Sequence, residues 1–308
     1  MATPRSQLVD STVPLFYHLV SRCVRRSWLC GRDRQSGQDF SHRKDWLLDR
    51  MTRLARCFTV EIAAWAIMDN HFHLVVYFDP SACRHWTDDE VARRWVDAFP
   101  PKVDGEVDEG LKALALEQLL DDPNRLADRR RKLGCLSTFM KHLKQPIALR
   151  ANQEDGCQGH FFESRFYSGA LLTEEAVIAS MAYVDLNPVR AKIARSLEQC
   201  RNTSIEARLQ HLENTAERLL ESIGSLVSGI GDAVRRIPMT LGDYIEVLRQ
   251  LIRAERPDTD PDGPNKLSSW LARVRAIGKR QRAYGSAQAL SQWIKPRGWK
   301  QPRACLPE

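Results

Sequence analysis

No stretch of this sequence stays apolar for the roughly 20 residues that a helix needs to span a bilayer. Residues 1–11 also lack the apolar core of a secretion signal. These absences predict a cytoplasmic protein with no membrane partner. The eight cysteines include no CxxC pair, which favours free thiols over disulfides or a cysteine-based zinc site.

Charge is distributed unevenly along the 308 residues, which carry a net charge of +7. Residues 263–308 contain ten Lys or Arg and one acidic residue, whereas residues 88–128 contain twelve acidic and five basic residues. A positive balance of this kind favours a polyanionic partner. The basic C-terminal end is the segment expected to contact it.

Hydrophobic periodicity predicts an α+β fold. Strands are expected at 15–24, 58–68, 71–78 and 161–172, and helices at 39–57, 136–152 and 174–187. Pro146 should kink or interrupt the second of these helices. The order β-α-β-β-α-β, followed by a further helix, is that of a ferredoxin-like antiparallel sheet. We expect its helices to pack on one face.

Two segments lie outside this core. Residues 84–132 are acidic and contain several Pro and Gly, so they predict a largely helical insertion. Beyond residue 200 the chain reads as helical, with a basic helical segment over 266–299. We therefore expect one domain over residues 1–200, including the insertion, and a basic helical C-terminal extension over residues 201–308.

The motif with the clearest chemistry is His71-Phe72-His73. Alternate side chains of a strand point to opposite faces, so the two imidazoles should point the same way while Phe72 enters the core. Two imidazoles side by side on a rigid sheet form half of a divalent-metal site. A catalytic site would still require a third ligand and a nucleophile.

Tyr183 and Asn187 could supply these two groups. They are four residues apart in a predicted helix, and residues at that spacing share a helix face. Two imidazoles and an amide oxygen leave positions open for phosphate oxygens on Mg²⁺ or Mn²⁺, and the imidazoles favour Mn²⁺. A metal that polarises a phosphate would make a phenol an adequate nucleophile.

Each of these residues also has an ordinary structural explanation. A histidine pair on a strand can be a hydrogen-bonded surface pair, and a tyrosine often sits at a sheet–helix interface. Asn187 precedes Pro188 and could simply end its helix. Tyr167, at the fourth strand, is the rival nucleophile.

Three segments together resemble the single-tyrosine HUH transposases, and within them the REP-associated tyrosine transposase group. They are Met68-Asp69-Asn70-His71-Phe72-His73, Gly159-His160-Phe161-Phe162-Glu163-Ser164-Arg165-Phe166 and Tyr183-Val184-Asp185-Leu186-Asn187-Pro188-Val189-Arg190-Ala191. The resemblance covers about residues 13–200, and residues 240–308 resemble the C-terminal extension of longer bacterial members.

This resemblance implies that His71 and His73 bind a divalent metal and that Tyr183 attacks DNA. The products would be a 5′-phosphotyrosine link and a 3′-OH, on single-stranded DNA that folds into imperfect hairpins. Asn187 takes the position of the third ligand, where insertion-sequence relatives have glutamine. The implied activity is DNA transposition, a form of DNA recombination.

Basic residues interleaved with aromatic ones are typical of proteins that bind single-stranded or hairpin DNA. The alternative is a solvated helix face whose tryptophans belong to the core. The residues predicted to contact DNA are Arg129, Arg130, Arg131, Lys132, Lys141, Lys144, His160, Arg165, Arg190, Arg273, Arg275, Lys279, Arg280, Arg282, Trp293, Lys295, Arg297 and Lys300.

The leading hypothesis is therefore a metal-dependent single-strand DNA endonuclease and strand transferase. A domesticated protein that binds structured DNA or RNA without cutting it is the alternative from a different class. A replication-initiating or conjugative HUH nuclease would share the chemistry but usually adds a second tyrosine or helicase-like segments. We expect a monomer, because the insertion and the extension could each block a dimer through the sheet edge.

Overall fold

The computed structural model describes residues 4–24, 30–33, 37–163, 165–212, 216–230, 236–255, 265–299 and 305–306. Its centre is a six-stranded sheet with the order β10-β6-β1-β3-β2-β8. All neighbouring strands are antiparallel except β10, which is parallel to β6. The strands of this sheet are β1 (Leu15–Arg22), β2 (Val60–Ile67), β3 (His71–Phe78), β6 (Tyr167–Leu171), β8 (Val227–Ser228) and β10 (Ala283–Tyr284).

The order β6-β1-β3-β2 forms a ferredoxin-like core, so the predicted α+β fold with an antiparallel central sheet is confirmed. The predicted strand 161–172 is wrong at its start, because β6 begins at Tyr167. The residues before it continue the pairing beside β1 through an isolated bridge between Cys23 and Phe162. Two backbone bonds accompany this bridge, from the Glu163 amide to the Arg22 carbonyl (2.8 Å) and from the Val24 amide to the Phe161 carbonyl (3.0 Å).

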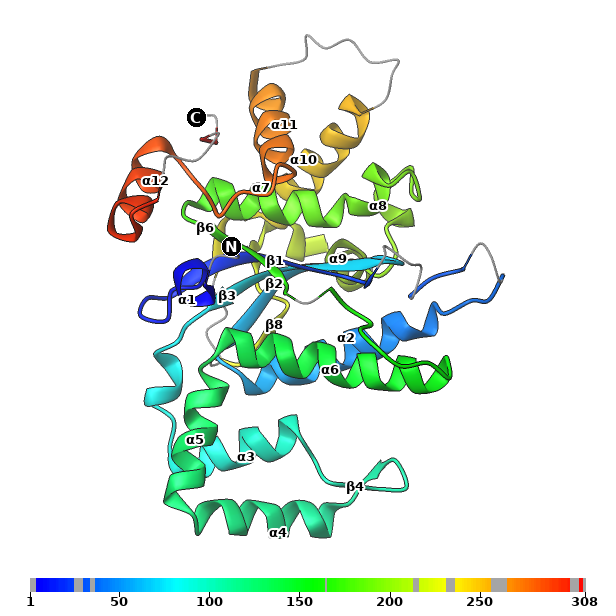
Figure 1. Cartoon of the computed structure of the whole chain (residues 1–308). Coiled ribbons are helices and arrows are strands. Elements are labelled where there is room, and N and C mark those ends of the chain that lie inside the picture. The colour runs from blue at the N-terminus through cyan, green and yellow to red at the C-terminus, as the bar shows by residue number, and fades with distance from the viewer. Residues whose placement is uncertain are drawn as a thin grey trace.

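Helices cover both faces of the sheet rather than the single face that we expected. Figure 1 shows α2 (His42–Cys57) and α6 (Leu136–Glu154) beneath it, and α7 (Glu174–Asp185) above it. The reason is visible in β2, whose eight residues are all buried. A strand buried on both faces needs a packed layer on each side, and the hydrophobic residues form one cluster on each side of the sheet.

Small side chains allow α7 to lie close to the sheet. The contact between α7 and β2 is made largely by alanines: Ala63, Ala64 and Ala66 on the strand, and Ala176, Ala179 and Ala182 on the helix. Thr173 caps the helix through its hydroxyl, which accepts a bond from the Ala176 amide (3.3 Å). This packing fixes the height of the helix above β3.

Pro146 lies inside α6, and the helix continues through it to Glu154. A proline cannot donate the bond that would normally reach the carbonyl four residues earlier. That carbonyl belongs to His142, and the Arg50 Nε donates to it instead (2.5 Å). A side chain of α2 thus replaces the missing helix bond, which explains why the predicted interruption does not occur.

The acidic insertion forms a unit below the sheet in Figure 1. It consists of α3 (Asp88–Ala98), the two-residue strands β4 (Lys102–Val103) and β5 (Glu106–Val107), α4 (Glu109–Leu120) and α5 (Pro123–Leu133). Arg94 attaches it to the core by donating to the carbonyls of Arg56 (2.9 Å) and Gly229 (2.7 Å). The prediction of a largely helical insertion agrees with this unit.

The C-terminal extension is less purely helical than predicted. After α8 (Asn187–Arg190) the chain contains α9 (Ser204–Leu212), β7 (Ser222–Gly224), β9 (Arg236–Thr240), α10 (Leu241–Ala254), α11 (Asn265–Ile277) and α12 (Ala287–Ile294). β8 and β10 also belong to this part and cover the two edges of the four-stranded core. The short helix α1 (Arg5–Leu8) precedes β1. Among the described residues, no helix combines the length and apolarity needed to cross a membrane.

Candidate active site

His71 and His73 lie at the start of β3, on the face that α7 covers. His73 is opposite Val20 of β1, and His71 is opposite Arg22. Residues directly opposite in an antiparallel pair share a face. Phe72 belongs to the core on the other side, which the sheet forms with α2 and α6. The alternation predicted for this motif is therefore confirmed.

The Nδ1 atom of each histidine is held by a neighbour. The His71 Nδ1 lies 2.6 Å from the Asn70 Oδ1, and the His73 Nδ1 lies 2.9 Å from the His18 Nε2. The His73 Nε2 lies 3.2 Å from the Asn187 side-chain nitrogen. Asn187 is also a hydrogen-bond partner of His71, whose Nε2 is the ring nitrogen left for it. One carboxamide is thus shared by two imidazoles.

This donor set fits a divalent cation. Amide orientation is assigned rather than observed, and turning Asn187 by half a rotation would present its oxygen to the His73 Nε2. Metal-binding imidazoles are usually oriented by a partner on their other nitrogen, as Asn70 and His18 provide here. In the described part of the chain, no three His, Cys, Asp or Glu side chains gather as a metal-binding group. The candidate set is therefore two histidines and one amide.

Burial keeps these histidines neutral. It is the largest cause that lowers the pKa of His71 to about 4, and the charges of Arg22 and Arg280 lower it further. Burial likewise lowers the pKa of His73 well below its usual value and that of His18 to about 3. Neutral imidazoles carry the free lone pair that a metal requires, so these two side chains are in the protonation state that a cation would need.

Tyr183 lies on α7 directly above the histidines. Its ring centroid is 5.7 Å from that of His73 and 5.8 Å from that of His18, with edge contacts to both. The side chain is only partly buried. Among the described residues, its hydroxyl has no hydrogen-bond partner, so the oxygen is not committed to a structural role.

The expected single helix from Glu174 to Asn187 is wrong at its end. α7 ends at Asp185, and the short helix α8 begins at Asn187. Leu186 between them leaves helical geometry (ψ 8°). Two residues later, Pro188 has no N–H to donate to the carbonyl four residues earlier, that of Val184, which is consistent with the helix ending here. Tyr183 and Asn187 still both reach His73, as the predicted shared face required.

Tyr167 is committed elsewhere. Its hydroxyl donates to the Gln281 carbonyl and lies 2.7 Å from the Tyr284 hydroxyl. Burial raises its pKa well above the usual value of a tyrosine. A phenol that is buried, bonded and hard to ionise is a poor nucleophile, so the geometry favours Tyr183 over its rival.

Asp185 anchors the chain between Tyr183 and Asn187. It is completely buried, and its Oδ1 accepts from the Ser204 hydroxyl and from the Ile205 amide (2.8 Å). Its Oδ2 accepts from the Tyr244 hydroxyl (2.6 Å). Burial raises the pKa of Asp185, against the opposing effect of these bonds. The carboxylate therefore ties α7 to α9 and α10.

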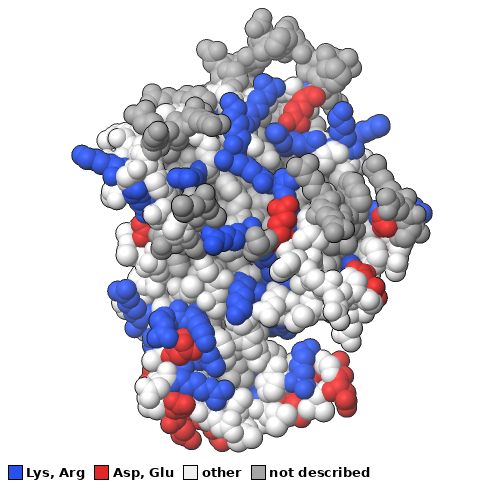
Figure 2. Space-filling view, in the orientation of Figure 1, with Lys and Arg blue, Asp and Glu red and all other residues white. Residues whose placement is uncertain are grey.

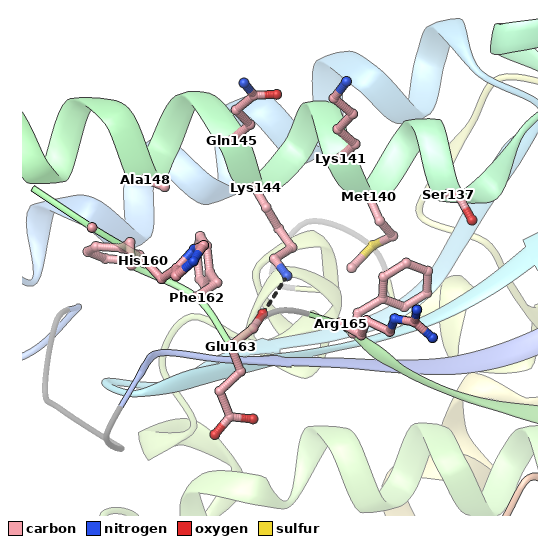
Figure 3. Close-up of a pocket in the computed structure, with 13 residues that line it drawn as sticks. Ser137, Met140, Lys141, Lys144, Gln145, Ala148, His160, Phe162, Glu163 and Arg165 are labelled. Atoms are coloured by element: carbon pink, nitrogen blue, oxygen red, sulfur yellow. Dashed lines mark hydrogen bonds between the residues drawn. The ribbon is translucent and has the colours of Figure 1, made fainter. Parts of the chain in front are cut away.

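Four of the predicted DNA contacts gather around one groove on the opposite face of the sheet. Figure 3 shows the groove between α6 and residues 159–166, a cavity of about 570 Å³. Its aromatic and sulfur-containing lining is Met140, Phe161, Phe162 and Phe166. The basic side chains around it are Lys141, Lys144, His160 and Arg165, with Glu163 as the acidic one. Lys144 lies over the Phe162 ring, 5.3 Å from its centroid.

A second basic cavity, of about 870 Å³, lies beside α8 and contains two more predicted residues. Arg190 and Arg275 line it together with Lys192 and Arg195. Arg190 lies over the Tyr183 ring at 4.8 Å and pairs with Glu255 (3.3 Å). Figure 2 shows Lys and Arg side chains running from this upper part of the molecule down its face, with acidic side chains most numerous over α3–α5.

The basic run Arg129, Arg130, Arg131 and Lys132 is engaged within the insertion. Arg129, Arg131 and Lys132 all pair with Asp128, at 2.9, 2.7 and 2.6 Å. Arg130 pairs with Asp88 (2.6 Å) and donates to two backbone carbonyls. Contact of these four residues with DNA would require their ion pairs to be replaced by phosphate contacts. In the structure the four basic side chains instead stabilise the insertion.

Predictions in the basic C-terminal segment divide in two. Trp293 is buried in the core and Arg297 lies over it at 3.5 Å while pairing with Asp10 (2.5 Å), so the packing contradicts an open stacking surface there. The other predicted DNA contacts of this segment that the structure describes are exposed or partly exposed: Arg273, Arg275, Lys279, Arg280, Arg282 and Lys295. Lys300, also predicted, lies outside the described residues.

Sequence reasoning left His18 unassigned, although it is the buried partner of His73. Only the pairing of β1 with β3 brings the two together, because 55 residues separate them in the chain. The available signal was that His18, Val20 and Arg22 alternate along the first strand and so share a face.

No family model and no curated protein matches this sequence. Among solved structures, the chain is similar to one described as a REP-associated tyrosine transposase bound to a REP hairpin, with a TM-score of 0.35 and 13% identity. The match covers 78% of this chain and all of that chain. We assign neither family nor activity on a likeness of this size.

Proposed function

We propose that this protein is a metal-dependent endonuclease and strand transferase of single-stranded DNA. Tyr183 would be the nucleophile, and His71, His73 and Asn187 would hold Mg²⁺ or Mn²⁺. The observation that carries the proposal is the meeting of these four side chains on one face of the sheet. The His73 Nε2 lies 3.2 Å from the Asn187 amide, and its ring centroid lies 5.7 Å from that of Tyr183.

The reaction is a transesterification at phosphorus. The Tyr183 oxygen bonds to the phosphorus and loses its proton to solvent, while the bond to the 3′-oxygen of the preceding nucleotide breaks and that oxygen takes up a proton from solvent. The products are a 5′-phosphotyrosine and a 3′-OH. His71, His73 and Asn187 would hold a divalent cation, which would neutralise charge that develops on the phosphate oxygens. A 3′-OH from another strand can reverse the step, which completes strand transfer.

The substrate class is inferred from charge and shape. Arg190 lies over the Tyr183 ring and Arg280 over the Tyr167 ring. The groove at α6, on the other face of the sheet, combines basic with aromatic side chains. Phosphate neutralisation with base stacking is the mode of single-strand binding. We infer a hairpin with single-stranded flanks as the DNA. β8 and β10 cover the edges of the sheet core, which supports a monomer because an exposed edge is the usual route to pairing.

A labelled hairpin oligonucleotide with single-stranded flanks tests the proposal. In Mn²⁺ or Mg²⁺ the wild-type protein should form an adduct that survives denaturing gel electrophoresis. Tyr183→Phe should abolish the adduct, whereas Tyr167→Phe, the matched loss of a hydroxyl from a neighbouring tyrosine, should retain it. His71→Ala should lose both the adduct and the binding of Mn²⁺ measured without DNA.

Two results would contradict the proposal. An adduct that persists in Tyr183→Phe would refute the nucleophile. Salt-dependent hairpin binding with no adduct in any metal would instead identify a protein that binds structured nucleic acid without cutting it.

A further inference from the structure

The chain leaves α11 through a turn that lies against the nucleophile helix. A Cβ added at Gly278 would lie 3.3 Å from the Tyr183 Cε2, so a side chain there would crowd the tyrosine ring. Two residues later, Arg280 has a φ of 46°. This left-handed conformation is strained for a residue other than glycine, and such strain often marks functional sites.

Several bonds hold this turn to the sheet. The Gln281 amide donates to the Tyr284 hydroxyl (2.8 Å), which donates to the Ile277 carbonyl (3.0 Å). Residues Ala283 and Tyr284 then pair with β6 as strand β10. The position of Arg280 is thereby set by the same sheet that carries the histidines.

The Arg280 side chain lies beside the site. Its Cζ is 5.8 Å from the centroid of the Tyr167 ring, which is itself 6.0 Å from that of His18. Its charge contributes to lowering the pKa of His71 and of His73. The residue is exposed, and in the described part of the chain no carboxylate pairs with it.

We propose that Arg280 binds the phosphate that Tyr183 attacks, so that the C-terminal extension supplies a catalytic residue. This inference rests on the proposed function. A guanidinium offers paired donors that match phosphate oxygens, and it remains charged at every relevant pH. A cation held on strained backbone, without a carboxylate and next to metal-binding side chains, is suited to a phosphate that arrives with the substrate.

The full-length variant Arg280→Gly tests this role, because glycine adopts the left-handed backbone without strain. At saturating DNA, single-turnover adduct formation should slow by about 100-fold or more, with Arg280→Lys intermediate. Arg249→Ala removes one exposed arginine of α10 and should keep the wild-type rate. An Arg280→Gly rate within about threefold of wild type would overturn the proposal.

The Mn²⁺ affinity of Arg280→Gly distinguishes the proposed role from a purely structural one, because the two roles predict changes of opposite sign. Without DNA, Arg280→Gly should bind Mn²⁺ more tightly than wild type, because a positive charge beside the ligands is gone. Weaker binding would indicate that Arg280 only supports the structure, and would overturn the proposal.

A binding cycle separates this inference from the proposed function. Hairpins that carry a neutral methylphosphonate at one flank phosphate at a time are titrated against wild type and Arg280→Gly. At one phosphate, the loss of affinity caused by the methylphosphonate and the loss caused by Arg280→Gly should be non-additive. That result supports the contact between Arg280 and this phosphate even if the wild-type protein forms no adduct. Additivity at every phosphate would overturn it.

Discussion

Removing the carboxylate of Asp185 should destabilise the protein more than any other single change near the site. The side chain is fully buried and accepts three hydrogen bonds, from the Ser204 hydroxyl, the Ile205 amide and the Tyr244 hydroxyl. All three donors are themselves buried. In Asp185→Ala none of them has a replacement acceptor on that residue.

The size of the effect follows from these donors and from Arg208. A buried donor left without a partner costs about 1–3 kcal/mol. Arg208 is also buried, and the charge of Asp185 opposes the effect of burial on its pKa, so loss of the carboxylate adds to the cost. Because the effects overlap and the site relaxes, we expect Asp185→Ala to lower the free energy of unfolding by about 4 kcal/mol.

Urea denaturation followed by tryptophan fluorescence measures this loss. Asp185→Asn keeps an acceptor for Ser204 and Ile205, and Tyr244 can accept from the new amide, so it should lose only about 1–2 kcal/mol. Tyr244→Phe removes one donor and should lose a similar amount. A loss below about 1 kcal/mol in Asp185→Ala would refute the anchoring role.

Three further predictions concern the site and its surroundings. His18, His71 and His73 have folded pKa values below the unfolded value of 6.5, so the unfolded state binds protons first as pH falls. Unfolding free energy should therefore drop between about pH 6.5 and 4, by up to about 1.4 kcal/mol per pH unit for each histidine, and a flat profile by denaturation would contradict their burial. His18→Phe should weaken Mn²⁺ binding by about 10–100-fold in titration calorimetry, whereas His142→Phe on α6 should not; equal affinities would remove His18 from the metal site. The double change Lys141→Ala and Lys144→Ala should lower the slope of log affinity against log salt by about 1.4, as two lost single-strand phosphate contacts require. Lys102→Ala in the insertion is the control, and an unchanged slope in the double variant would exclude the groove from DNA binding.

The sequence was sufficient to predict the four core strands of the sheet, which carry strong local patterns, but not the two-residue strands β8 and β10. β3 begins and ends where expected. Only one alternation of its side chains keeps both histidines on one face and Phe72 in the core on the other. β6 was predicted too long because Phe161 and Phe162 are aromatic, whereas their segment makes an isolated bridge with two backbone bonds and no continuous strand. Hydrophobic periodicity indicates that such a segment is buried, but it does not indicate whether the segment pairs with a neighbouring strand.

The site could be predicted only where one element carries the chemistry. His71 and His73 share a strand, and Tyr183 and Asn187 are four residues apart, so each pair follows from spacing. His18 could not be found this way, because its contact with His73 depends on strand pairing. The partner of Arg130 was equally hidden, since Asp88 is brought to it by the packing of α3 against α5. Asp128, by contrast, lies within four residues of Arg129, Arg131 and Lys132, so those three pairs follow from spacing along the helix.

The position of α7 between two layers connects the chemistry of the site to the stability of the extension. Its lower face packs on the alanines of β2, and its upper side contacts α11, which leads into Gly278 and Arg280 (Figure 1). A helix held on both sides cannot shift toward the histidines without disturbing one of these contacts. The separation between the Tyr183 ring and His73 is therefore set jointly by the small residues of the sheet and by the extension. Loosening of α11 should move the nucleophile before it unfolds the sheet, since the core beneath the histidines belongs to the separate cluster that contains Phe72.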